Sequence, residues 1–226
     1  MKLSSPPGPI DRRILWTASL ILWTGFAITA SAVFGGKVEA FDRWGLLAAR
    51  AGGEHRFIGS AFALEAVRDM TALGGVLLRN LFVLGAAVAL LLLGRRREAV
   101  VFALTVAGGW IANTLVKALI ARERPQIVPH LMEAGGESFP SGHSFNAAVV
   151  YIAMALAFAA LSRRQSVRYT LVAGAMLLSA AIAWSRVMLG VHFPSDVVAG
   201  WLGGAAWAFT AAALLYRPAE AEVPSG

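Results

Sequence analysis

Three short clusters of polar residues in this chain have the residue types and spacing that binding of an anion requires. In the first, Lys117 and Arg124 stand seven residues apart, and Pro125 follows directly. That spacing is two turns of a helix, so the two cations share one face, and the proline limits how far the helix continues. Arginine suits bidentate binding of phosphate, and lysine neutralises charge as a point cation. By itself, the pair also fits an ordinary basic collar at a membrane interface.

The second cluster is Pro140-Ser141-Gly142-His143, directly before an apolar block. A Ser-Gly turn that enters a helix presents free backbone N–H groups and the positive end of the helix dipole, which together attract anions. The imidazole of His143 gains or loses a proton near neutral pH. A capping turn with an interfacial histidine is the simpler interpretation of this cluster alone.

The third cluster contains Arg186, His192 and Asp196. Asp196 lies four residues after His192, close enough to accept the Nδ1–H of the imidazole and fix its tautomer. A carboxylate behind an imidazole makes it a better nucleophile or base. The same pair also fits a structural hydrogen bond, and Pro194 between them suits the first position of a helix.

Long apolar blocks surround these clusters. The chain is 58% hydrophobic and only 15% charged, with a mean hydropathy of +0.65, well beyond the composition of a soluble domain. Six blocks are long enough to cross a hydrocarbon core of about 30 Å. They cover residues 14–34, 74–93, 99–116, 145–161, 169–184 and 197–216. They predict an all-α integral membrane bundle of six transmembrane helices, formed by a single domain over residues 1–226 with its core motifs in 117–196.

Two of the blocks carry irregularities. The second contains Arg79 and Asn80, and if the outer end of the span lies there, Arg79 can reach the interface. The first begins after Arg12 and Arg13 and ends in a small-residue stretch over 30–32, the pattern of a cleaved signal peptide. Its length and its tryptophans favour a retained membrane anchor instead.

The basic residues between the blocks predict the orientation. They precede the first span, join spans two to three and four to five, and follow span six. These residues are Lys2, Arg12, Arg13, Arg95, Arg96, Arg97, Arg163, Arg164, Arg168 and Arg217. Because short cytoplasmic links are enriched in Lys and Arg, this face is predicted to be cytoplasmic. All three polar clusters then lie together at the outward face.

The long outward link between spans one and two contains a second pattern. Val38, Phe41, Trp44 and Leu47 recur at helical spacing. They predict a short helix lying in the membrane interface, where it would guide a lipid. An amphipathic helix that packs on the bundle is the alternative.

Composition excludes several classes of function. The chain has no cysteine, so disulfides, thiolate catalysis and cysteine zinc sites are excluded. The net charge is +7, but half of the basic residues cap apolar blocks and no basic stripe with interleaved aromatics is present, so we predict no nucleic-acid partner. Two histidines, three cations and a carboxylate at one membrane boundary are costly unless they bind something, and a tetrahedral anion fits best.

Together the clusters resemble the three-part signature of the type 2 phosphatidic acid phosphatase superfamily. The matching elements are Lys117-x6-Arg124-Pro125, Pro140-Ser141-Gly142-His143 and Ser185-Arg186-x5-His192-x3-Asp196. Residue type, spacing and order all agree, and three motifs in register are highly specific. The resemblance implies a membrane lipid phosphatase that needs neither a metal nor another cofactor. Asp196 is the only carboxylate at a matched position of the motifs, too few for a two-metal phosphatase.

The resemblance also implies a role for each matched residue. His192 would attack phosphorus and form a phosphohistidine, oriented by Asp196, and His143 would protonate the leaving oxygen and then activate water. The groups implied to bind the phosphoryl oxygens are Lys117, Arg124, the Ser141 hydroxyl, the Gly142 N–H and Arg186. The expected partners are a lipid phosphate and membrane lipids, while the oligomeric state is not readable from the sequence.

Two other functions share some of these features. Vanadium-dependent haloperoxidases have a similar site but are soluble and larger, so six spans argue against them. A non-catalytic lipid transporter or scaffold is the other alternative, and the complete signature argues against it. Undecaprenyl pyrophosphate, phosphatidylglycerol phosphate, phosphatidate and lipid A phosphates all suit the site. The compact chain is similar to bacterial members, so we expect the inner membrane, with the site facing the periplasm or exterior.

Overall fold

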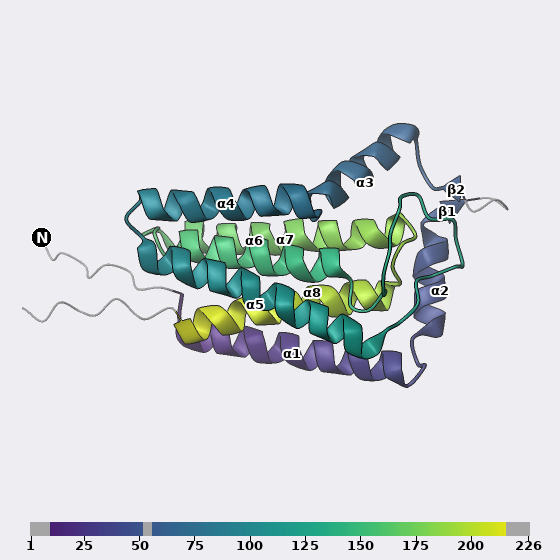
Figure 1. Ribbon diagram of the computed structural model, residues 1–226, viewed down its shortest axis with the longest axis horizontal. Helices are drawn as coiled ribbons and strands as arrows, with labels where there is room; N and C mark the ends of the chain where they lie inside the picture. Colours follow the sequence, from purple (N-terminus) through teal and green to yellow (C-terminus); the bar gives the residue numbers. More distant parts are fainter. Residues whose placement is uncertain (1–9, 52–55, 216–226) are drawn as a thin grey trace, which may run out of the picture.

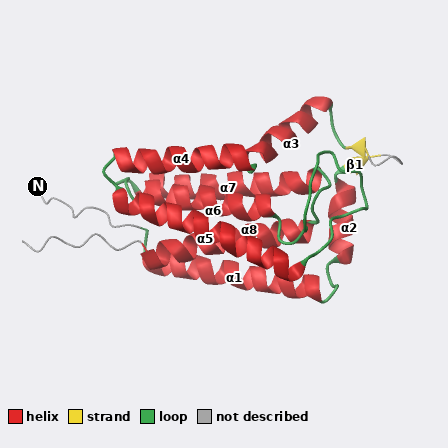
Figure 2. Cartoon of the chain, in the orientation of Figure 1, coloured by secondary structure: helices red, strands yellow, loops and turns green. Residues whose placement is uncertain are grey.

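The computed structural model describes residues 10–51 and 56–215. In that part of the chain, eight helices and two short strands follow one another. The helices are α1 (Arg12–Phe34), α2 (Glu39–Ala48), α3 (Ala61–Leu73), α4 (Val76–Leu92), α5 (Arg96–Ile120), α6 (Gly142–Ala159), α7 (Gln165–Met188) and α8 (Pro194–Leu215). The strands β1 (Arg50–Ala51) and β2 (Arg56–Phe57) pair antiparallel. Helices and loops dominate the described fold (Figure 2).

The long helices run side by side along one axis, with α2, α3 and the strand pair at one end of the bundle (Figure 1). α6 is the most buried span, and α5, α7 and α8 all pack against it. The outer surface instead carries large apolar side chains, among them Leu92, Leu119 and Leu177, each more than 70% exposed. Because lipid tails are as apolar as leucine, such a surface suits a bilayer. The expected all-α membrane bundle is confirmed.

The spans agree with the predicted blocks to within a few residues. Helices α1, α5, α6, α7 and α8 are each long and apolar enough to cross a membrane, and α3 and α4, which are bent against each other, reach that length and apolarity only when they are taken together. The predicted end of the last span at Tyr216, with Lys2 and Arg217, lies outside the described residues. The basic links join the helices at the end opposite α2 and α3 (Figure 1).

The second span differs from the expected single helix. α3 and α4 meet at Gly74 and Gly75 with a bend of 50°. A Cβ on Gly74 would lie 2.5 Å from Ile182 Cγ2, so the break sits tightly against α7. Tyr151 Oη donates a hydrogen bond of 2.8 Å to the Leu73 carbonyl, which the bend has freed from its helical partner. Arg79 lies in the first turn of α4 and its side chain is buried against the bundle, only 9% exposed. Its reach to the interface stays a prediction.

The predicted helix between spans one and two is present as α2. Phe41 and Trp44, from the predicted apolar stripe, are exposed and stack on each other, with ring centroids 6.3 Å apart. The opposite face packs on the bundle, where Gly45 leaves no room for a Cβ beside Pro194. Leu47, the last residue of the stripe, packs against the core beside Leu46, so the stripe divides between an exposed part at Phe41 and Trp44 and a packed end, and both interpretations stay open. The strand pair and α3 in the same link were not predicted.

Close packing of α8 on α6 brings the second and third polar clusters together. A Cβ on Gly200 would lie 2.7 Å from the Ser141 carbonyl, so the helices approach at backbone distance. The N–H of Ser141 donates to the Asp196 carbonyl at 3.0 Å. α8 begins at Pro194, as expected. Small residues on α8 therefore set the spacing between the starts of these two helices.

Candidate active site

Six of the eight residues singled out by sequence line one cavity of about 340 Å³ at the α2–α3 end of the bundle. They are Lys117, Arg124, Gly142, His143, Arg186 and His192. The segment 132–137, in the link between α5 and α6, forms the rest of the wall. Asp196 and Ser141 are fully buried. Three helix ends and one long link therefore enclose a cationic hollow with two histidines.

His192 lies in the link between α7 and α8 and is only 2% exposed. Its Nε2 is 3.1 Å from Nη1 of Arg124, and its Nδ1 is 3.2 Å from Oγ of Ser138. A guanidinium only donates, so Nε2 accepts and keeps its lone pair, which places the ring proton on Nδ1. The nitrogen on the Arg124 side is therefore the free one, which suits a nucleophile.

The expected direct hydrogen bond between His192 and Asp196 is absent. Nδ1 lies 3.7 Å from Oδ2 of Asp196, too far for a hydrogen bond. The Ser138 hydroxyl stands between them, accepting from Nδ1 and donating to Oδ2. The carboxylate thus orients the imidazole through a serine. The sequence offered one signal for this residue, since Ser138 lies three positions before Ser141 at the edge of the second cluster.

Asp196 is held from its other side by Arg122. Nη1 of Arg122 donates to Oδ1 of Asp196 at 2.6 Å, and Nη2 donates to Oδ2 of Asp42 at 2.7 Å. Asp42 also accepts from the backbone N–H of Ser195 at 2.9 Å. Burial lowers the pKa of Arg122, but the two carboxylates outweigh it, so the pKa is raised overall. The result is a continuous chain of hydrogen bonds from α2 to the imidazole of His192.

Sequence reasoning missed Arg122 and Asp42 for different reasons. Arg122 lies two residues before Arg124, at a position that the Lys117-x6-Arg124 motif leaves unspecified. Asp42 lies about 150 residues from Asp196, within a helix whose apolar stripe was the only recognised feature. No local pattern in the sequence connects such distant partners.

Two of the cations are bound to backbone carbonyls of the cavity wall. Lys117 Nζ donates to the Glu137 carbonyl at 2.7 Å. Arg124 donates to the carbonyls of Gly135 at 2.7 Å and Gly136 at 3.0 Å. Burial lowers the pKa of Arg124, and Asp196 and Glu137 oppose that shift only in part. These donors face the cavity and are the groups that an anion would take over.

Arg186 leaves a donor open. Its Nη1 donates to Thr71 Oγ1 on α3 and to the Met132 sulfur, both at 2.9 Å. Its Nε is buried, and no acceptor in residues 10–51 or 56–215 reaches it. A buried donor without a partner is costly. An anion in the cavity lined by Arg186 would relieve that cost.

The electrostatics keep His192 neutral near pH 7. Burial lowers the pKa of the imidazole to about 4, against the opposing effect of Asp196 and with added repulsion from Arg124 and Arg186. A neutral imidazole carries the lone pair that attack on phosphorus needs. Surrounded by cations, it is also well placed to meet an anionic substrate.

The start of α6 supplies the second histidine. Ser141 caps the helix, its hydroxyl oxygen accepting from the Ser144 N–H at 3.4 Å and from the Ser144 hydroxyl at 2.9 Å. The proton of the Ser141 hydroxyl is not used in these contacts, and its donation to phosphate stays a prediction. His143 follows in the first turn and lines the cavity, where the helix dipole favours negative charge.

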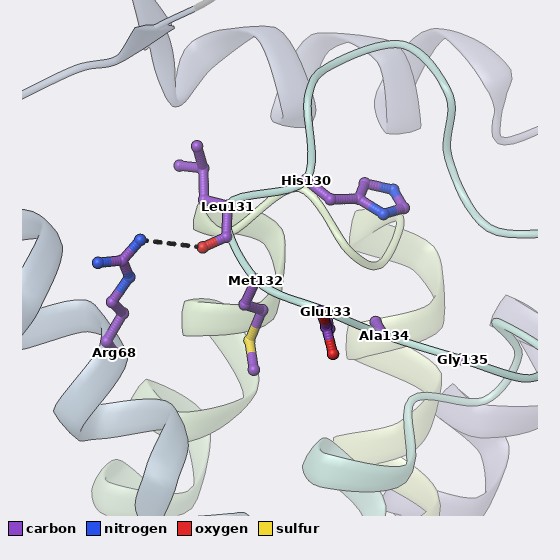
Figure 3. A pocket seen from close by; sticks show the side chains of 7 residues that line it. All are labelled: Arg68, His130, Leu131, Met132, Glu133, Ala134 and Gly135. Atoms are coloured by element: carbon purple, nitrogen blue, oxygen red, sulfur yellow. Dashed lines mark hydrogen bonds between the residues drawn. The ribbon is translucent and has the colours of Figure 1, made fainter.

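A second hollow of about 840 Å³ adjoins the cavity and shares the segment 132–135 with it. Figure 3 shows this segment running past Arg68 of α3, whose guanidinium donates to the Leu131 carbonyl at 3.2 Å. The segment therefore lines both hollows. Among residues 10–51 and 56–215, no three His, Cys, Asp or Glu side chains gather as metal ligands do. Metal independence stays a prediction.

Comparison with known proteins places this geometry in context. The model of the PAP2 superfamily matches residues 98–219, more than half of the chain. Phosphatidylglycerophosphatase B of Bacillus subtilis is 40% identical over 97 residues, covering 40% of this chain and 45% of that protein. Lipid A 1-phosphatase of Rhizobium etli is 35% identical over 127 residues, covering 52% and 50%. The chain spans about half the length of these curated relatives.

A solved structure is similar over a much larger share. It is the crystal structure of a transmembrane PAP2-type phosphatidylglycerolphosphate phosphatase from Bacillus subtilis. The alignment covers 86% of this chain and 94% of that one, with a TM-score of 0.77 and 26% identity. The helical arrangement around the cavity is therefore shared with a membrane phosphatase of known structure.

Proposed function

This chain belongs to the PAP2 superfamily, and on that premise we propose that it is a membrane lipid phosphatase acting through a phosphohistidine. One observation carries the proposal. The Nε2 of His192 is free of its proton and stands on the wall of a cavity that also holds Lys117, Arg124 and Arg186. A nucleophile surrounded by cations suits attack on phosphorus in an anionic ester.

In the first step, Nε2 of His192 attacks phosphorus and forms a P–N bond. The bond from phosphorus to the leaving oxygen breaks, its electron pair stays on that oxygen, and His143 supplies a proton to it. Ser138 and Asp196 stabilise the imidazolium that develops, since the Ser138 hydroxyl accepts a hydrogen bond from Nδ1 and donates one to Asp196. We call this Ser138–Asp196 pair the relay. The cations and the start of α6 stabilise the charge on the phosphoryl oxygens.

In the second step, water attacks the phosphohistidine. His143, now neutral, takes a proton from that water, and the P–N bond breaks with its electron pair returning to Nε2. Inorganic phosphate leaves, and both histidines regain their starting states. The chain's own residues supply every group in this cycle, and no metal enters it.

The decisive test is phosphate release by the purified protein in detergent with a chelator. The panel contains a prenyl diphosphate, phosphatidylglycerol phosphate, phosphatidate and a lipid A phosphate. We expect release from at least one lipid and inhibition by vanadate. Release from none, or bromide oxidation that depends on added vanadate, would contradict the proposal and favour a transporter or a haloperoxidase respectively.

We also propose that the cavity opens to the outer side of a bacterial inner membrane. The support is the gathering of basic links at the end of the bundle opposite the cavity (Figure 1). Gly135 is exposed at the cavity wall and has open space where a Cβ would stand, and the chain has no native cysteine. Gly135→Cys should react with an impermeant thiol reagent in spheroplasts. Labelling only after lysis would place the cavity on the cytoplasmic side.

A further inference from the structure

One buried hydroxyl at the cavity end of the bundle has no role in the mechanism above. It belongs to Thr71 on α3, outside the residues 98–219 that the family model matches. α3 has 13 residues, all of them described by the structure, and Thr71 is the only one that is buried, at 4% exposed. Buried hydroxyls in proteins are hydrogen-bonded, so the partner of Thr71 indicates what the hydroxyl is for.

That partner is Arg186. Nη1 of Arg186 donates to Oγ1 of Thr71 at 2.9 Å and to the sulfur of Met132 at 2.9 Å. Nη1 carries two hydrogens, and both therefore have an acceptor. The hydroxyl oxygen is the stronger acceptor of the two, because a thioether sulfur accepts only weakly. Thr71 is thus the main contact that fixes this nitrogen of the guanidinium.

The other edge of the same guanidinium has no partner. Nε of Arg186 is buried, and neither Nε nor Nη2 meets an acceptor within residues 10–51 and 56–215. Because Nη1 lies on the Cδ side of the planar group, the Nε–H and one Nη2–H point in parallel from the opposite edge. That edge is the fork with which arginine binds two oxygens of a phosphate. Arg186 lines the cavity, so a phosphoryl group bound there meets a guanidinium whose fork is free.

The packing of α3 on α7 explains how Thr71 reaches Arg186. α3 packs more on α7 than on α4, from which it bends away by 50° at Gly74 and Gly75 (Figure 1). A Cβ on Gly74 would lie 2.5 Å from Cγ2 of Ile182, so α3 and α7 approach closely there. Thr71 lies one turn before Gly74 on α3. Arg186 lies one turn after Ile182 on α7, so each pair shares a face of its helix. The glycine contact therefore sets the register that brings the hydroxyl to the guanidinium.

The two side chains differ in stiffness, which gives the contact a purpose. Threonine is branched at Cβ, so few positions of its hydroxyl are available on a helix. Arginine is long and has much rotamer freedom to lose. Donors that stabilise developing charge work best when their direction is settled before the substrate binds. A hydrogen bond from the flexible side chain to the stiff one achieves that for Arg186.

We propose that Thr71 is a positioning residue for the phosphate-binding site. Its hydroxyl holds Nη1 of Arg186, so that Nε and Nη2 stay free to bind two oxygens of the phosphoryl group. Thr71 does not line the cavity, and it acts only through Arg186. The inference rests on the proposed function and deepens it, because it extends the phosphate-binding site to α3.

The first test removes the acceptor and keeps the shape of the side chain. Thr71→Val should lower kcat/KM about tenfold and raise the Ki of orthovanadate by a similar factor, the loss expected for one hydrogen bond to a charged group. Both are measured with the purified protein on the lipid of the panel that it hydrolyses fastest. Thr71→Ser keeps a hydroxyl and should retain most of the activity. The matched control is Thr105→Val, because the Thr105 hydroxyl is also 4% exposed but donates to a carbonyl of its own helix.

The second test asks whether the effect passes through Arg186. Lysine binds phosphate as a point charge and has no fork to orient. Adding Thr71→Val to Arg186→Lys should therefore lower kcat/KM much less than adding it to the wild type, whereas a merely structural threonine would cost the same factor in both backgrounds. The rise in Tm on addition of orthovanadate gives the same comparison without relying on turnover.

The outcomes separate the two proposals. If the wild type hydrolyses a lipid phosphate and Thr71→Val equals it, the positioning role is overturned and the phosphatase stands. A Thr71→Ser variant as weak as Thr71→Val, or equal losses in the two backgrounds, also overturns the role and makes Thr71 a packing residue. If the wild type releases phosphate from no lipid, the proposed function fails and this inference fails with it. Should Thr71→Val not accumulate, Thr71→Ala and Thr71→Ser carry the comparison.

Discussion

The two histidines of the cavity lie in opposite kinds of surroundings. Around His192 the hydrogen-bonding groups are already paired, through Ser138 and Asp196 to Arg122 and Asp42. Around His143 one donor is open, because Arg186, whose charge acts on both histidines, has a buried Nε with no partner among the residues that the structure describes. The nucleophile is thus fixed before substrate arrives, whereas the leaving-group side is left for the substrate to complete.

That difference has a physical reason. A nucleophile gains from preorganisation, because folding has already oriented it and the binding energy of the substrate is not used for that orientation. Donors that stabilise charge must be available to the ligand, so their protein partners must be few or easily displaced. Carbonyls of the segment 135–137 meet that condition, because they can move away from Lys117 and Arg124 without breaking a helix.

The largest effect expected is at the nucleophile itself. His192→Ala should lower phosphate release by about 10⁴-fold or more, because no other group in the cavity replaces the attacking nitrogen. The measurement is turnover per mole of protein extracted from the membrane, so that expression does not distort it. His130→Ala removes a histidine that does not line the cavity and should keep most of the activity. Undiminished turnover in His192→Ala would defeat the mechanism.

Removing the Ser138 hydroxyl tests whether this serine preorganises His192. Ser138→Ala should lower kcat about tenfold, the cost of one hydrogen bond near a developing charge, and change KM little. The matched control is Ser179→Ala, which removes a buried hydroxyl hydrogen-bonded to Trp201 instead. If kcat is unchanged in Ser138→Ala, Asp196 acts without the serine and the relay has no catalytic part.

The far end of the same network should affect stability more than rate. Asp42→Ala leaves Arg122 with one carboxylate and the N–H of Ser195 without its acceptor. We expect the Tm in detergent to fall by several degrees, roughly 2–4 °C for each kcal/mol lost, and kcat to fall less than in Ser138→Ala. Glu39→Ala, at an exposed acidic position of α2, is the control. A Tm equal to that of the wild type would mean that Asp42 does not hold α2 on α8.

The smallest effect expected is a dependence of stability on pH. Burial lowers the pKa of His192 to about 4 in the folded protein, whereas the pKa of an imidazole in the unfolded chain is about 6.5. Between these two pH values the unfolded chain binds a proton at His192 and the folded protein does not. Stability therefore rises with pH across this window and is lost as the pH falls from about 6.5 to about 4. The Tm should fall less steeply in His192→Asn. Equal slopes in the two proteins would contradict a lowered pKa at His192.

Much of this molecule was predictable because the signals were local. Apolar blocks long enough to span a bilayer gave the helices, and a signature carried within 80 residues gave the residues of the cavity. The bend between α3 and α4 was not predictable from hydropathy, because Arg79 and Asn80 within an apolar block read as an interfacial end. Whether a charge at such a position faces water or the bundle depends on what packs against it.

The sequence by itself therefore determined the membrane spans, the shared end of the three clusters and the chemical types gathered there. Tertiary structure decided which atoms meet. It put Ser138 between His192 and Asp196, joined Asp42 to the same carboxylate through Arg122, and turned Arg79 into the bundle. The reason is that hydropathy and motif spacing act along the chain, whereas hydrogen bonds between residues 42, 122, 138 and 196 exist only after the helices have packed.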